Sequence, residues 1–132
     1  MTPEDAIDAT IDYLKAMELR DLDRARGYLA EPVKMVFPGG RRFSSIDEIV
    51  ANSGGRYARV CKTITGRRAW REGSVTCVLI TGTLYGEWKD GEGFDGIRFV
   101  DFFELEDGKI RLQEVWNDTG ERVLARQAEA AE

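Results

Sequence analysis

The stretch that decides the fold is FVDFFELEDGKIRLQEVWN, residues 99–117. Asp107-Gly108, in its middle, is a dipeptide that favours a two-residue type I′ turn between antiparallel strands. Apolar and polar residues alternate on both sides of this turn, with the period of a strand that buries one face. The stretch therefore predicts a β-hairpin with strands over 97–106 and 109–117.

Two further strands precede this hairpin, over 59–70 and 74–88, with a predicted turn at Glu72-Gly73. Both faces of strand 74–88 carry apolar side chains, so each face needs a cover. One face is expected to pack on helices. The other is expected to pack on a second copy of the chain, which predicts a homodimer through the outer sheet face.

Helical spacing dominates the first part of the chain. Thr2 and Pro3 suit the start of an amphipathic helix over about 3–19, and Asp21 starts a short second helix that Pro32 closes. A strand follows over 33–37, and Ser45 with Glu48 forms a capping box for a third helix. Helices followed by an antiparallel meander predict an α+β fold. We expect one domain over 1–118 and a loosely helical or disordered tail over 119–132.

The 132 residues include no histidine and carry a net charge of −5. Without an imidazole base, Ser–His–Asp and Cys–His catalysis and histidine zinc sites are excluded. We therefore expect no metal and no cofactor, and proton transfer would fall to carboxylates, Tyr, Lys or water. The strand register keeps Cys61 and Cys77 apart, which predicts two reduced thiols.

Several partner classes are not expected. The acidic total argues against nucleic acid, and the acidic N-terminus and the lack of a long apolar run argue against a signal peptide or membrane span. We expect a cytoplasmic protein. Residues 41–71 nevertheless carry eight basic and two acidic residues. This basic run could attract an anion, although pairing with the acidic strands is the expected arrangement.

A two-residue loop at Asp107-Gly108 places Asp101 directly opposite Glu114 on an otherwise apolar face. Two buried carboxyls about 4.5–5.5 Å apart would titrate as a coupled pair, with one of them retaining a proton. Such a pair could supply an acid and a base. Two alternatives stay open: an arginine neutralises the pair, or a bulge turns one carboxylate outward.

The chain over 3–118 resembles the NTF2-like superfamily, in its SnoaL-like branch. The resemblance rests on the opening helix pair with DLDRA at 21–25, the strand and Pro38-Gly39-Gly40 turn before the helix at Ser45, and the hairpin at 99–110. It implies a cone-shaped, curved antiparallel sheet wrapped around the N-terminal helices, with a deep apolar pocket inside.

Among these proteins, the ketosteroid isomerases use a tyrosine on the first helix and an aspartic acid on the penultimate strand to hold an enolate oxygen. Tyr13 and Asp101 fall on these positions. The general-base aspartate of that family falls on Phe37, which cannot accept a proton. Other branches use a histidine, or an Asp–Arg–Asp set into which Arg98 fits poorly.

These considerations favour a small-molecule pocket, with acid–base chemistry of isomerase, hydrolase or cyclase type on a carbonyl or polyketide-like compound. The alternative is a non-catalytic ligand-binding or dimerisation module. The candidate catalytic residues are Tyr13, Asp101 and Glu114. The candidate pocket residues are mostly apolar or aromatic: Met17, Phe37, Tyr57, Leu79, Thr81, Tyr85, Phe99, Phe103 and Trp116.

Overall fold

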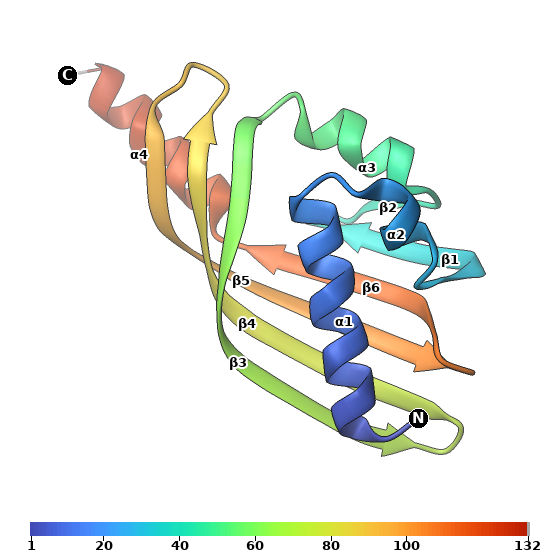
Figure 1. Cartoon of the computed structure of the whole chain (residues 1–132). Helices are drawn as coiled ribbons and strands as arrows, with labels where there is room; N and C mark the ends of the chain where they lie inside the picture. The colour runs from blue at the N-terminus through green and yellow to red at the C-terminus, as the bar shows by residue number, and fades with distance from the viewer. Residues whose placement is uncertain (132) are drawn as a thin grey trace.

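The computed structural model describes residues 1–131, which form four helices and one six-stranded sheet (Figure 1). The helices are α1 (Pro3–Glu18), α2 (Leu22–Arg26), α3 (Ile46–Ser53) and α4 (Thr119–Ala131). The strands are β1 (Leu29–Phe37), β2 (Arg41–Phe43), β3 (Tyr57–Glu72), β4 (Val75–Trp88), β5 (Gly93–Glu106) and β6 (Lys109–Asn117). The α+β class is confirmed.

The strand order is β2-β1-β6-β5-β4-β3. The sheet is mixed, because β1 pairs with β6 in parallel while every other neighbouring pair is antiparallel. The expectation of a wholly antiparallel sheet was wrong at this one pairing. Parallel neighbours need a long connection, and residues 38–108 provide it.

Helix α1 lies across the concave side of the bent sheet (Figure 1). Its start matches the prediction, because Thr2 and Asp5 form a reciprocal capping box ahead of the first turn. The buried residues of α1 fall on the face turned toward the sheet: Ala6, Thr10, Tyr13, Leu14 and Ala16. This face and the concave side of β4 and β5 make up most of the core.

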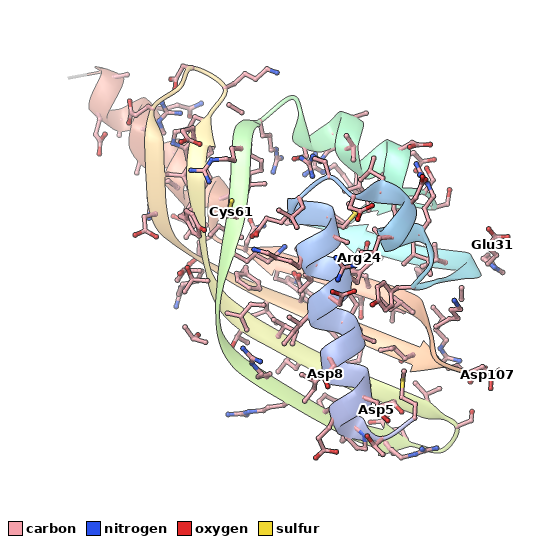
Figure 2. All side chains as sticks on the ribbon, viewed as in Figure 1. Asp5, Asp8, Arg24, Glu31, Cys61 and Asp107 are labelled. Atoms are coloured by element: carbon pink, nitrogen blue, oxygen red, sulfur yellow. The ribbon has the colours of Figure 1, made fainter. Side chains whose placement is uncertain are left out.

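Helix α2 packs beside α1 through a polar clamp in which Asp12 accepts hydrogen bonds from Arg24, labelled in Figure 2, and from Tyr28. The helix ends earlier than predicted. Leu29 already belongs to β1, and Pro32 lies inside that strand rather than closing a helix. Pairing with β6 overrides the helical spacing here, and the β1–β6 register shifts between Leu29 and Lys34.

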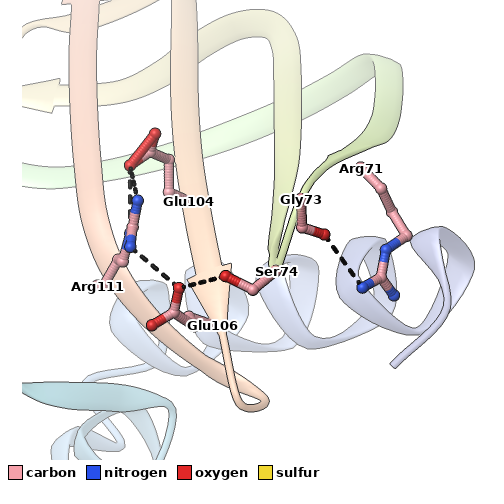
Figure 3. A network of polar contacts seen from close by, with 6 residues as sticks. All are labelled: Arg71, Gly73, Ser74, Glu104, Glu106 and Arg111. Atoms are coloured by element: carbon pink, nitrogen blue, oxygen red, sulfur yellow. Dashed lines mark hydrogen bonds and ion pairs between the residues drawn. The ribbon is translucent and has the colours of Figure 1, made fainter.

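A β-bulge interrupts the predicted hairpin. Leu105 pairs with Ile110 but Glu104 pairs with Leu112, so Arg111 is an extra residue in β6. One extra residue exchanges the faces of everything beyond it. Arg111 itself points outward and donates hydrogen bonds to Glu104 and Glu106, and Glu106 also accepts one from Ser74 (Figure 3).

The predicted opposition of Asp101 and Glu114 was therefore wrong. Asp101 pairs with Val115, and Glu114 pairs with Phe102 on the convex face. The alternative in which a bulge turns one carboxylate outward is the one found. Gln113, opposite Phe103, takes the concave position that had been expected for Glu114.

The β3–β4 hairpin also differs in register, because its turn is Gly73-Ser74 and a further irregularity lies between Ile64 and Gly66. Cys61 faces Tyr85 and Cys77 faces Trp70. In the described residues both cysteines are free thiols, as predicted.

Helix α4 starts at Thr119, directly after the expected domain limit, and it contacts β5. The Arg126 guanidinium lies 4.9 Å from the centroid of the Trp88 ring, and Arg126 also pairs with Asp90. Residues 119–131 are therefore a helix docked on the sheet. Over residues 1–131, none of the helices is long and apolar enough to cross a membrane.

Candidate functional site

A cavity of about 130 Å³ lies between α1, α3 and the concave face of the sheet. An apolar cavity of about 150 Å³ admits benzene, so the space suits a molecule of about one ring. Its lining combines apolar side chains, among them Met17, Phe37, Ile49, Val60, Leu84, Phe99 and Val115, with polar and charged ones such as Tyr13, Tyr57, Asp101 and Gln113. This combination is typical of a small-molecule site.

Asp101, on β5, is the most unusual group in this wall. It is fully buried, and neither carboxyl oxygen has a hydrogen-bond partner among residues 1–131. Lys62 Nζ lies 3.5 Å from Asp101 Oδ2, an ion-pair contact that is longer than an ordinary hydrogen bond. Burial raises the pKa of Asp101, and the nearby Lys62 charge opposes that rise. The site therefore favours a carboxyl group that keeps its proton and can donate it.

Lys62 lies on β3 and lines the same cavity. Its ammonium lies 5.3 Å from the centre of the Phe99 ring, so the cation also contacts an aromatic face. Glu18 does not neutralise this ammonium. Its two oxygens instead accept hydrogen bonds from the backbone N–H of Lys62 and from Lys15 Nζ.

Tyr13 and Gln113 form a second polar pair in the wall. The Tyr13 hydroxyl donates to Gln113 Oε1 at 3.2 Å, and the Tyr13 ring packs edge-on against Phe103. Burial raises the pKa of Tyr13, and the Asp101 charge adds to that rise, so the phenol stays protonated. Gln113 was not among the predicted site residues, because only the bulge at Arg111 brings it to this face.

Three arginines stand where the cavity opens. Arg20 follows α1, Arg41 lies on β2 and Arg56 precedes β3, and all three line the cavity. Arg41 donates to Asn52 Oδ1 at 2.5 Å and to the Pro38 carbonyl at 3.2 Å. Burial lowers the pKa of Arg41, and the Arg56 charge lowers it further.

The structure brings six of the predicted site residues to the cavity: Tyr13, Met17, Phe37, Tyr57, Phe99 and Asp101. Phe103 is fully buried behind Tyr13. The remaining five do not line the cavity: Leu79, Thr81, Tyr85, Glu114 and Trp116. Trp116 is 54% exposed on the convex face. Leu79, Thr81 and Tyr85 alternate with the inward-facing Val78, Ile80 and Leu84, so they also point outward.

Phe37 occupies the position expected for a general base. It lines the cavity and packs edge-on against Phe43, with ring centres 5.3 Å apart. Besides the three arginines, the ionisable residues of the lining are Tyr13, Glu18, Tyr57, Lys62 and Asp101. Among residues 1–131, His, Cys, Asp and Glu form no cluster of three that could hold a metal ion.

Comparison with known proteins agrees with this geometry. The model of the SnoaL-like domain family matches residues 11–113. A search of curated proteins found no match.

Solved structures with a similar fold include an NTF2-like protein of unknown function from Burkholderia pseudomallei. Its TM-score is 0.75 at 20% identity, over 93% of this chain and 96% of that one. A provisionally named SnoaL-like polyketide cyclase from Jannaschia sp. has a TM-score of 0.71 at 14% identity, over 93% of each chain. An LEH-like epoxide hydrolase from M. tuberculosis has a TM-score of 0.67 at 21% identity, over 89% of this chain and 85% of that one. Since the family model covers most of the sequence and the fold agrees, the chain belongs to the SnoaL-like domain family and has the NTF2-like fold.

Proposed function

We propose that the cavity binds a small, largely apolar carbonyl compound and that Asp101 donates a hydrogen bond to its oxygen. The observation that carries this proposal is the full burial of Asp101 with neither oxygen hydrogen-bonded within residues 1–131. A buried polar group without a partner is costly, and a ligand oxygen in the cavity would supply the missing partner.

We propose acid–base chemistry on this compound, of the isomerase or cyclase type. A protonated Asp101 would stabilise negative charge as it develops on the carbonyl oxygen, and the Lys62 ammonium, 3.5 Å from Asp101 Oδ2, would add positive charge beside it. Tyr13 is assigned a positioning role, because its hydroxyl donates to Gln113. Glu114 has no part in this mechanism, since it lies on the convex face.

The test is turnover and binding of a panel of cyclic and aryl ketones by the wild-type protein and by Asp101→Asn. We expect the asparagine variant to lose at least about 100-fold in rate, because an amide can donate a hydrogen bond but cannot transfer a proton as the carboxyl group does. Glu114→Gln is the matched control, since it removes a carboxylate from the same hairpin on the other face. Equal rates for wild type and Asp101→Asn would remove Asp101 from the mechanism.

Phe37 favours a second candidate function, which is ligand binding without catalysis. A phenyl ring in the position expected for the general base leaves Asp101 and Glu18 as the carboxyl groups of the lining, and both oxygens of Glu18 are already hydrogen-bonded. In this case the ketones would bind, binding would weaken in Asp101→Asn, and neither protein would turn them over.

We also propose that the convex face pairs with a second copy of the chain. Trp116 and Trp70 are exposed there, and Trp70 packs against Phe102 on β5. Light scattering at micromolar concentration should give the mass of a dimer, and Trp116→Asp should give that of a monomer. A monomeric wild type would contradict this. The cytoplasmic location and the lack of a nucleic-acid partner stay predictions from the sequence.

A further inference from the structure

The opening of the cavity is positively charged in a chain whose net charge is −5. Arg20, Arg41 and Arg56 converge on it from three separate segments. Within residues 1–131, none of the three forms an ion pair.

The basic run over 41–71 was expected to pair with the acidic strands. In the described chain this holds only for Arg59, which pairs with Glu87, and Lys62, which pairs with Asp101. The expectation was wrong for Arg41 and Arg56. These two cations line the cavity, whereas Glu104 and Glu106 of β5 pair with Arg111 on the convex face.

Among the three arginines, Arg41 shows the shortage of anionic partners most clearly. Its guanidinium is partly buried, and its two hydrogen bonds go to neutral oxygens, those of Asn52 and Pro38. Burial and the neighbouring Arg56 both disfavour its charge. Buried cations are normally paired with anions, so a partner is missing from the described chain.

Arg20 adds an independent observation. It follows the last turn of α1 with φ of 59°, in a Schellman motif closed by the hydrogen bond from the Asp21 N–H to the Ala16 carbonyl. Glycine is the usual residue at this left-handed position, because other side chains are strained there. A long cationic side chain thus lines the cavity from a position where glycine is the usual residue, and its guanidinium donates to the neutral Met17 carbonyl at 2.9 Å.

We propose that the ligand is an organic acid, with its carboxylate held by Arg41 and Arg56 at the opening and its apolar body directed toward Asp101. Arginine recognises carboxylates through paired hydrogen bonds, and the half-buried Arg41 and the exposed Arg56 together supply two such groups. Glu18, the other carboxylate of the lining, does not compete, because both of its oxygens are already bonded. This inference rests on the proposed ligand-binding function of the same cavity.

The experiment compares ligands that differ only in charge: 4-acetylbenzoate and its neutral isostere 4-acetylbenzamide, titrated by calorimetry. We expect the acid to bind at least about tenfold more tightly than the amide, as a charged hydrogen bond implies. The difference should shrink as salt is raised.

Arg41→Gln and Arg20→Gly should each weaken acid binding by several-fold and leave amide binding unchanged. Arg20→Gly relieves the left-handed backbone position, so this variant keeps its fold even if Arg41→Gln does not. Arg68→Gln, in the same basic run but outside the cavity, is the matched control and should bind both ligands like wild type.

The outcomes separate the two proposals. Equal affinities for acid and amide would overturn the organic-acid inference and leave the carbonyl-binding function intact. If neither compound nor any ketone of the panel binds, both proposals are overturned. A loss of acid binding in Arg68→Gln equal to that in Arg20→Gly would show a general charge effect and would also overturn the organic-acid site.

Discussion

The carboxyl groups on the two faces of the β5–β6 hairpin have opposite environments. On the convex face, Glu104 and Glu106 share the exposed guanidinium of Arg111 through hydrogen bonds of 3.1 to 3.3 Å. On the concave face, Asp101 is fully buried and has only the Lys62 ammonium, 3.5 Å away. The two sets of carboxyls stand on the same strand, a few residues apart.

This difference indicates which of the carboxyl groups is associated with function. Exposed ion pairs contribute about 0–1 kcal/mol each, and water can replace them when they break. A buried carboxyl without hydrogen bonds destabilises the folded state, so a chain that keeps one is expected to use it. Each of the following variants tests the difference between the two faces.

Inserting one alanine after Arg111 should have the largest effect. If the bulge keeps one extra residue, residues 112–117 each move one position along β6 and exchange faces. Glu114 and Trp116 would then enter the core beside Asp101. We expect a loss of more than about 5 kcal/mol, which removes most of the stability of an ordinary domain. Urea unfolding followed by circular dichroism measures this. Deleting Arg111 is the control, because Glu104 and Leu112 can still pair and every side chain keeps its face. An insertion variant as stable as the wild type would contradict the argument.

Phe103→Ala tests how much side-chain packing on the concave face contributes to stability. Phe103 is fully buried against Tyr13, and truncation of such a ring costs about 3–5 kcal/mol. Phe102→Ala, one residue away on the half-buried convex face, should cost only about 1 kcal/mol. Denaturant midpoints give both values, and equal losses would mean that the faces are not distinct.

Asp101→Asn should stabilise the protein at neutral pH, although it weakens function, because the amide removes a buried group that must bear a charge once it ionises. Burial raises the folded-state pKa of Asp101 above its unfolded value near 3.8. Below that unfolded pKa both states hold the proton, so the wild type bears no penalty. As the pH rises through the folded pKa, the wild type loses stability that the variant keeps.

The difference in unfolding free energy between wild type and Asp101→Asn should therefore be near zero at acid pH and grow toward neutral pH. Thermal or urea unfolding across that range measures it. A difference that does not change with pH would contradict the buried, proton-retaining carboxyl.

Glu104→Gln should have the smallest effect, about 0.5 kcal/mol or less at low salt, because its partner Arg111 is exposed and keeps Glu106. The effect should vanish at high salt. A loss above about 1 kcal/mol, measured by urea unfolding, would mean that the convex network is more than a solvated surface.

The sequence predicts the parts of this fold that depend on local chemistry. The capping boxes at Thr2 and Ser45 and the turn at Asp107-Gly108 are local signals, and the helices and the hairpin start and end close to them. Tyr13 and Asp101 were identified from a resemblance and do reach the cavity.

The predictions that were wrong depend on strand pairings, which no local sequence signal indicates. An extra residue at Arg111 has no sequence signature, yet it moves Glu114 out and Gln113 in. The parallel pairing of β1 with β6 depends on strands far apart in the chain, which is why Leu29 was assigned to a helix. Lys62 was noted only as part of a basic run, because its contact with Asp101 crosses the bent sheet.

Strand β3, 16 residues long, lies at an edge of the open sheet. Free strand edges invite another chain to add a strand, which is a route to aggregation. Here the Glu18 carboxylate covers the Lys62 N–H at this edge, and a row of cations runs along the strand: Arg59, Lys62, Arg67, Arg68 and Arg71. Two such edges would repel one another, so the cations disfavour the addition of a second β3 edge and the fibril growth that it would start.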